Sequence, residues 1–247
     1  MFDLSMFQWL IAVICALFIG FTKTGVPGLG ILAIPLMTEV VSARASTGVI
    51  LPMLIFGDVF AVAYYHRHAV WSHIVRLMPW TASGVVLGYL AMGSISDAQL
   101  KPLIGVIVLA MLGINYWRNS RKKAEASVPT GRLFAAGMGV AAGVTTMMAN
   151  AAGPILTIYL LAMQLPKTEF IGTGAWYYLI LNWFKVPFSF SLGLITAETL
   201  QLNLLLFPAV AAGALAGIKI LKHIPEKGFS TLVQVLTAAA AIKLLFY

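Results

Sequence analysis

Residues 20–37 of this chain, GFTKTGVPGLGILAIPLM, decide how it folds. Two apolar runs of roughly 15 residues flank a polar break at 22–28, and each run is shorter than the ~20 residues that a helix needs to cross a bilayer. The break holds a lysine, two threonines, glycines and a proline, which interrupt a helix and free backbone groups to bind a ligand. Inside a membrane such a break persists only where it is buried in protein or lines a water-filled cavity. The pattern returns at 143–163, GVTTMMANAAGPILTIYLLAM, so the sequence predicts two copies of one unit, each organised around a break.

The composition is that of a protein that crosses a membrane several times. Of the 247 residues, 60% are hydrophobic and 10% are charged, and the mean hydropathy is +0.93. A soluble domain needs a far more polar surface than this. The net charge of +8 gathers in a few loops, where it reports orientation in the membrane rather than nucleic-acid binding. Cys15 is the only cysteine, which excludes disulfides within the chain and thiolate metal clusters.

We predict an all-α integral membrane protein of two repeats in inverted topology, each a re-entrant or broken helical hairpin followed by three transmembrane helices. The first repeat covers 1–117, and the second covers 133–247. A basic cytoplasmic linker at 118–132 joins them. The expected elements are, in the first repeat, a hairpin at 6–38 and spans at 43–65, 74–92 and 99–117, and in the second, a hairpin at 133–163 and spans at 169–192, 200–221 and 228–247.

The duplication can be followed residue by residue at a slowly rising offset. Matched residues are 123 positions apart in the hairpins (143 − 20), 126 apart in the next spans (173 − 47) and 129 apart in the spans after those (208 − 79). Growth of the loops after a duplication produces this rise. The matched residues are Gly20, Thr22 and Gly30 with Gly143, Thr145 and Gly153, then Thr47 and Gly48 with Thr173 and Gly174, then Pro79, Gly84 and Gly88 with Pro208, Gly213 and Gly217.

The basic loops decide between inverted and parallel copies. If the hairpins are re-entrant, each copy crosses the membrane three times and the second copy is inverted. The loops at 66–76 and 118–132 and the loop around Lys222 then all face the cytoplasm, as the positive-inside rule asks. If each hairpin crosses fully, the copies are parallel and these loops fall on opposite sides. The inverted reading is favoured, although it leaves Arg44 and Lys101 on the outer side.

The breaks carry the first candidate binding residues. Lys23 has apolar residues on both sides, and an ionisable group at membrane depth marks a pathway or a paired charge. The alternative is that it extends to the membrane interface, but the break offers it a cavity. Helices that begin at the breaks would aim their positive N-terminal ends inward, which favours an anion. The remaining candidates of the two breaks are Thr24 and Gly25 in the first, and Thr145, Thr146 and Asn150 in the second.

Two further candidates lie at similar depths in the spans that follow the hairpins. Asp58 shifted by 126 falls at 184, next to Lys185. Either the two side chains neutralise each other in a structural pair, or Lys185 faces the anion while Asp58 carries a coupling proton. Asn182 precedes Lys185 by three residues and therefore shares its helix face.

Other features point away from catalysis. The predicted spans contain no histidine to activate a serine, and the chain has no Gly-x4-Gly-Lys loop for ATP. We therefore expect no enzyme, no cofactor and no metal site, and transport that is secondary or a passive conduction. The aromatic run at 176–183 is interpreted mainly as packing or lipid contact, and the Gly-x3-Gly pairs at 84–88 and 213–217 as close helix packing.

Four stretches resemble the TauE/SafE sulfite exporter family, which belongs to the wider 4-toluene sulfonate uptake permease group. They are FTKTGVPGLGILAIPL at 21–36, STGVILPMLIFGDVFAVAYY at 46–65, ANAAGPILTIYLLAM at 149–163 and GTGAWYYLILNWFKVPFS at 172–189. The family's polar positions carry over to Lys23, Thr24, Asn150, Asn182 and Lys185. The second copy has Thr146 where the first has Lys23, so the breaks do not supply two lysines.

The resemblance implies a multi-pass secondary transporter of the bacterial inner membrane for sulfite, sulfoacetate or another sulfonate. The expected partners are a small anionic substrate, the lipid bilayer and a second copy of the chain in a homodimer. Two other functions stay open, a passive anion channel and a membrane scaffold that transports nothing.

Overall fold

The computed structural model describes residues 3–24, 29–120 and 131–220, together with isolated positions between 235 and 246. Every regular element in these ranges is a helix, so the prediction of an all-α protein is confirmed for the described part of the chain. Most of the predicted linker at 118–132 and of the predicted span at 228–247 lies outside the described residues.

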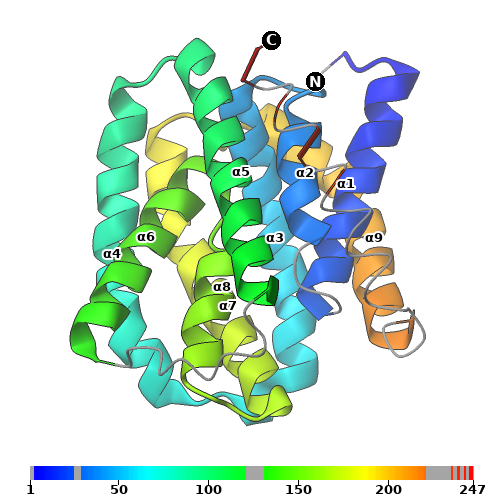
Figure 1. Cartoon of the computed structure of the whole chain (residues 1–247). Coiled ribbons are helices and arrows are strands. Elements are labelled where there is room, and N and C mark those ends of the chain that lie inside the picture. The colour runs from blue at the N-terminus through cyan, green and yellow to red at the C-terminus, as the bar shows by residue number, and fades with distance from the viewer. Residues whose placement is uncertain are drawn as a thin grey trace.

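The helices follow the predicted order. Five of them occupy the predicted spans with ends shifted by no more than three residues, and the two hairpins appear as α1–α2 and α6–α7 (Figure 1). The elements are α1 (Met6–Thr24), α2 (Leu29–Met37), α3 (Ala43–Tyr65), the short 3₁₀ turn η1 (His66–His68), α4 (Trp71–Ser94), α5 (Asp97–Ser120), α6 (Arg132–Ala149), α7 (Gly153–Ala162), α8 (Lys167–Ser191) and α9 (Ala197–Ile220).

The first limb of each hairpin is longer than the roughly 15 residues predicted from the bilayer-length argument. Helix α1 has 19 residues and α6 has 18, which corresponds to a rise of about 27–29 Å. The second limbs, α2 and α7, have 9 and 10 residues. Residues 22–24, which we placed in the break, form the last turn of α1, where Lys23 complements the negative end of the helix dipole.

Six helices in the described residues are long and apolar enough to cross a membrane, namely α1, α3 with η1, α4, α5, α6 and α9. The chain is therefore a multi-span membrane protein, as predicted. These are not the six helices that we expected to cross, because α1 and α6 are among them and α8 is not. Helix α8 is not among them because polar residues, which include Thr173, Asn182 and Lys185, lower its hydropathy.

The second break has a well-defined local geometry. Helix α6 ends where Asn150 adopts the left-handed conformation, with φ 53° and ψ 30°, and its backbone N–H donates to the carbonyl of Thr146. Asparagine tolerates this conformation better than most residues and is a common end for a helix. Helix α7 then begins at Gly153, with Pro154 in its first turn, where a missing N–H costs no hydrogen bond.

Each hairpin packs most closely against a helix of the other half of the chain. Helix α1 lies along α9, where a Cβ at Gly20 would collide with the carbonyl of Val210. Helix α6 lies along α4, where a Cβ at Gly143 would collide with the carbonyl of Thr81. Gly20 and Gly143 are matched residues of the predicted repeat, and only glycine lets the backbones approach this closely. In Figure 1, α1 and α3 run from the upper end of the bundle to the lower, whereas α6 and α8 run from the lower end to the upper.

Candidate functional site

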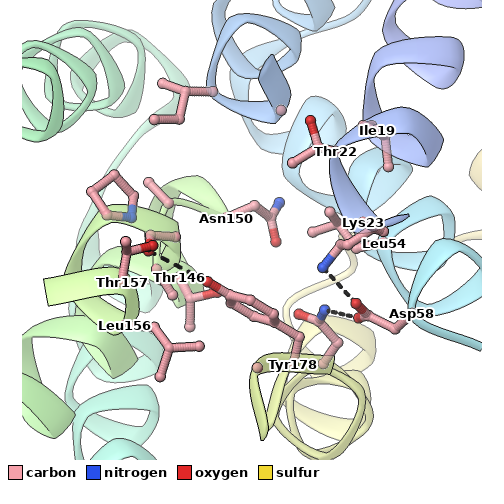
Figure 2. Close-up of a pocket in the computed structure, with 18 of the residues that line it drawn as sticks. Ile19, Thr22, Lys23, Leu54, Asp58, Thr146, Asn150, Leu156, Thr157 and Tyr178 are labelled. Carbon is pink, nitrogen blue, oxygen red and sulfur yellow. Dashed lines mark hydrogen bonds and ion pairs between the residues drawn. The ribbon is translucent and has the colours of Figure 1, made fainter. Parts of the chain in front are cut away.

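A cavity of about 160 Å³ lies between the two breaks. Both hairpins contribute to its wall together with α3 and α8 (Figure 2). Apolar side chains cover much of this wall, and polar groups gather where the breaks approach each other. The lining polar side chains of the described residues are Thr22, Lys23, Asp58, Thr146, Asn150, Thr157, Tyr178 and Asn182.

The charged centre of the cavity is an ion pair between the first hairpin and α3. The Lys23 Nζ lies 2.7 Å from Asp58 Oδ1, with the two side chains 9% and 0% exposed. Asn182 Nδ2 donates a hydrogen bond of 2.7 Å to the other oxygen, Asp58 Oδ2. A buried carboxylate requires this kind of partnership, because removing its counter-charge would leave an uncompensated ion in the membrane interior. Figure 2 shows both contacts as dashed lines on the right of the cavity.

Tyr178 joins the first hairpin to the second. The Lys23 Nζ lies 4.4 Å from the centre of its ring, a cation–π contact. The Tyr178 hydroxyl donates to the carbonyl of Gly153, at the start of α7, over 3.4 Å. We interpreted the aromatic run at 176–183 mainly as packing, so sequence reasoning missed this residue. The spacing along the chain could have indicated its role, because Tyr178, Asn182 and Lys185 follow one another at intervals of four and three residues and therefore share one face of α8.

Lys185 holds the second break in place from behind the cavity. Its side chain is 1% exposed, and its Nζ donates to Asn150 Oδ1 at 2.6 Å and to Thr146 Oγ1 at 3.1 Å. Asn150 Nδ2 in turn donates to the carbonyl of Thr47 in α3 at 3.1 Å. The alternative in which Asp58 and Lys185 neutralise each other is therefore wrong, because the carboxylate pairs with Lys23 while Lys185 binds neutral oxygens.

Two predicted site residues, Thr24 and Thr145, do not line the cavity in the described structure. The Thr24 hydroxyl donates to the carbonyl of Ala214 at 2.6 Å and so ties α1 to α9. The Thr145 hydroxyl donates to the carbonyl of Ala141 at 2.8 Å, within its own helix. Gly25 lies outside the described residues. Thr22, which matches Thr145 in the repeat, does line the cavity, and its buried Oγ1 has no hydrogen-bond partner among the described residues.

The short second limbs also open onto the cavity. Gly30, at the start of α2, and Gly153, at the start of α7, are matched residues of the predicted repeat, and both line the wall. The first turns of a helix leave backbone N–H groups unpaired and carry a partial positive charge. An ammonium paired with a carboxylate, a hydroxyl without a partner among the described residues, two amides and two helix starts therefore meet in one small space. Once the ammonium is released from the carboxylate, this chemistry suits an anion with oxygen atoms.

A family model described as Sulfite exporter TauE/SafE matches residues 12–244. The match covers nearly the whole chain, including both breaks and the residues that line the cavity. Comparison with curated proteins and with solved structures finds no match. The resemblance seen in the sequence is thus confirmed: the chain belongs to the sulfite exporter TauE/SafE family.

Proposed function

We propose that this protein is a secondary transporter that carries a small sulfur-containing or organic anion, such as sulfite, sulfoacetate or another sulfonate, across the bacterial inner membrane by alternating access. Membership of an exporter family and the membrane-spanning architecture support the coarser class, a membrane transporter. The observation that carries the finer proposal is the cavity between the two breaks, where Lys23 and the start of α7 converge.

In this proposal the anion binds between the tips of the two hairpins. Its oxygens accept hydrogen bonds from the Lys23 ammonium, from the unpartnered Thr22 hydroxyl and from the N-terminal backbone of α7. Asn150 and Thr146 shape the opposite wall, where Lys185 fixes their side chains. Thr24 and Thr145 act in packing rather than in binding, since their hydroxyls are bonded to backbone carbonyls.

Asp58 is the proposed coupling residue. While Asp58 is ionised it occupies Lys23, so an incoming anion must compete with a buried carboxylate at 2.7 Å. When Asp58 takes up a proton its charge disappears and the ammonium is released to the anion. Proton and anion therefore bind cooperatively, because each removes an obstacle to the other.

We infer further that the halves 1–117 and 133–247 are inverted repeats that rock against each other around this cavity. Support comes from the opposite courses of α1 and α6 in Figure 1 and from the exchange of partners between the halves, α1 with α9 and α6 with α4. Inverted repeats that meet at a central substrate site are the usual basis of alternating access. The inner-membrane location and the homodimer stay predictions, which fractionation and crosslinking test.

The proposal is tested first by thermal unfolding of the purified protein in detergent with a panel of anions, since a ligand that binds the folded state raises the midpoint. We expect a shift with sulfite or methanesulfonate in the wild type. Lys23→Ala alone leaves Asp58 unpaired, so the binding variant is Lys23→Ala with Asp58→Asn, and the control is Lys219→Ala at the end of α9. A shift retained by the double variant refutes the site.

Flux into vesicles then separates the functions. A passive channel conducts without saturating at modest concentration, and a scaffold shows no flux and tolerates loss of Lys23. Saturable flux that is lost in the double variant and kept in Lys219→Ala supports the carrier.

A further inference from the structure

We propose that each transport step moves one monovalent anion together with one proton, so that the transport is electroneutral, and that the substrate is no larger than about a substituted aromatic ring. This inference rests on the proposed function and specifies its substrate class and its coupling. It is carried by the charges that line the cavity and by the volume of that cavity.

The charge count begins with the lining residues. Among the described residues, the charged side chains on the cavity wall are Lys23 and Asp58, and they neutralise each other at 2.7 Å. Residues 25–28 of the first break, with the sequence GVPG, carry no ionisable side chain. The described part of the wall is therefore neutral while Asp58 is ionised.

When a substrate binds together with a proton, the cavity wall stays neutral only if the substrate is a monovalent anion. A proton that binds a carboxylate oxygen of Asp58 breaks the ion pair and leaves one uncompensated ammonium on Lys23. A monovalent anion restores neutrality at that ammonium, whereas a divalent anion leaves one buried negative charge without a counter-ion on the wall. One proton and one monoanion thus replace one ion pair, and the net charge of the wall is the same before and after.

The other groups around Asp58 do not change this count. From the helices packed on α3, the titratable side chains that face Asp58 are Lys23 of α1 and Lys185 and Tyr178 of α8. Lys185 does not line the cavity and is bonded to Thr146 and Asn150. The proposal assigns Lys185 and the Tyr178 phenol the same charge in both states, so that they cancel in the comparison.

The volume of the cavity sets the proposed upper limit on the size of the substrate. A buried cavity of about 150 Å³ accepts a benzene molecule, and the cavity here measures about 160 Å³. A small sulfonate such as methanesulfonate fits, and a fused two-ring sulfonate does not. The apolar part of the wall, which includes Ile31, Ile34 and Leu54, accommodates a short carbon tail.

The experiment uses the full chain in proteoliposomes. Methanesulfonate is the monovalent probe, methanedisulfonate the divalent one and naphthalenesulfonate the large one. Anion and proton uptake are measured together, first with a pH gradient and then with a membrane potential set by potassium and valinomycin. We expect one proton for each methanesulfonate, less than a twofold response to the potential, and at least tenfold slower flux of the other two probes.

Asp58→Asn tests the residue, because asparagine is shaped like the protonated acid and cannot release a proton. We expect it to bind methanesulfonate without proton uptake and to lose the response to the pH gradient, while Lys219→Ala behaves as the wild type. Thermal unfolding with and without methanesulfonate shows whether the variant is folded and binds.

The outcomes separate the two proposals. Saturable flux that depends on the membrane potential, that has another proton ratio, or that treats the three probes alike overturns this inference and leaves the transporter standing. Proton uptake that persists in Asp58→Asn overturns the assignment of the proton to Asp58. Absence of flux for every anion refutes the proposed function, and this inference with it.

Discussion

The two hairpin tips follow one sequence pattern, yet each tip contacts a lysine ammonium in a different way. At the first tip the hairpin itself carries the lysine, Lys23, and α3 supplies the carboxylate of Asp58. At the second tip the matched residue is the neutral Thr146, and the lysine, Lys185, comes from the packed helix α8. In both cases an ammonium lies at the C-terminal end of the first limb, where the helix dipole favours a positive charge.

This difference teaches that the two tips share a positive charge at the end of the first limb but do not supply it in the same way. The ammonium of the first tip is paired with a titratable acid, so its charge can be released to a substrate. The ammonium of the second tip is bonded to neutral oxygens of Asn150 and Thr146 and acts as an anchor. Substitutions at the two tips test whether one charge is releasable and the other is anchored.

The largest effect is expected from Lys23→Met at the first tip. It leaves Asp58 buried without its counter-charge, and breaking such a pair costs about 3–5 kcal/mol of unfolding free energy. The double variant Lys23→Met with Asp58→Asn should recover most of this loss but no transport. Denaturation in detergent and vesicle flux measure the two properties. Equal stability of the single and double variants would contradict the pairing.

Lys185→Met at the second tip should have a smaller effect on stability. It removes a buried charge but leaves Asn150 Oδ1 without its donor, and a stranded buried acceptor costs about 1–3 kcal/mol. Anion affinity should fall about tenfold, equivalent to ~1.4 kcal/mol, because the break loses its anchor and a nearby positive charge. Thermal unfolding without and with methanesulfonate measures the stability and the anion affinity of the variant. A loss of stability larger than that of Lys23→Met would reverse the assignment of the two tips.

Tyr178 tests the connection between the tips. Tyr178→Phe keeps the ring beneath Lys23 but loses the hydrogen bond to Gly153, which should cost about 0.5–1.5 kcal/mol of stability. Tyr178→Leu also loses the cation–π contact, and a further ~1–2 kcal/mol is expected. The apparent KM should rise in the same order. If phenylalanine and leucine behave alike, the ring does not position Lys23.

The smallest effect separates two matched threonines. Thr22→Val removes from the cavity wall a hydroxyl that has no partner among the described residues, and it should weaken anion binding by about 0.5–1.5 kcal/mol. Thr145→Val removes a hydroxyl that is bonded within its own helix, and it should leave anion affinity unchanged. Titration of both purified variants with methanesulfonate makes the comparison directly. Equal losses would mean that the two tips bind the anion symmetrically.

Sequence reasoning reached the helices and several residues that line the cavity but misplaced their contacts. The spans could be predicted because an apolar run that is long enough to cross a bilayer and is bounded by polar loops indicates a transmembrane helix. Lys23, Asp58, Asn150 and Asn182 were found because polar groups at membrane depth are costly and therefore conspicuous. One of the two alternatives for Asp58, a pair with Lys185, came from repeat arithmetic, which compares depth along the membrane and cannot tell which helix face is turned toward which neighbour.

The sequence alone determined the class of protein, the family and the positions of the two breaks. Glycine and proline interrupt a helix wherever they cluster, and a membrane tolerates the freed backbone only in a protected cavity, so these features follow from local chemistry. Only the tertiary structure decided that Lys23 pairs with Asp58, that Lys185 holds Asn150, and that Tyr178 spans the two tips. The physical reason is that a hydrophobic pattern does not specify which helix faces meet, because that choice depends on close packing at glycines far apart in the chain.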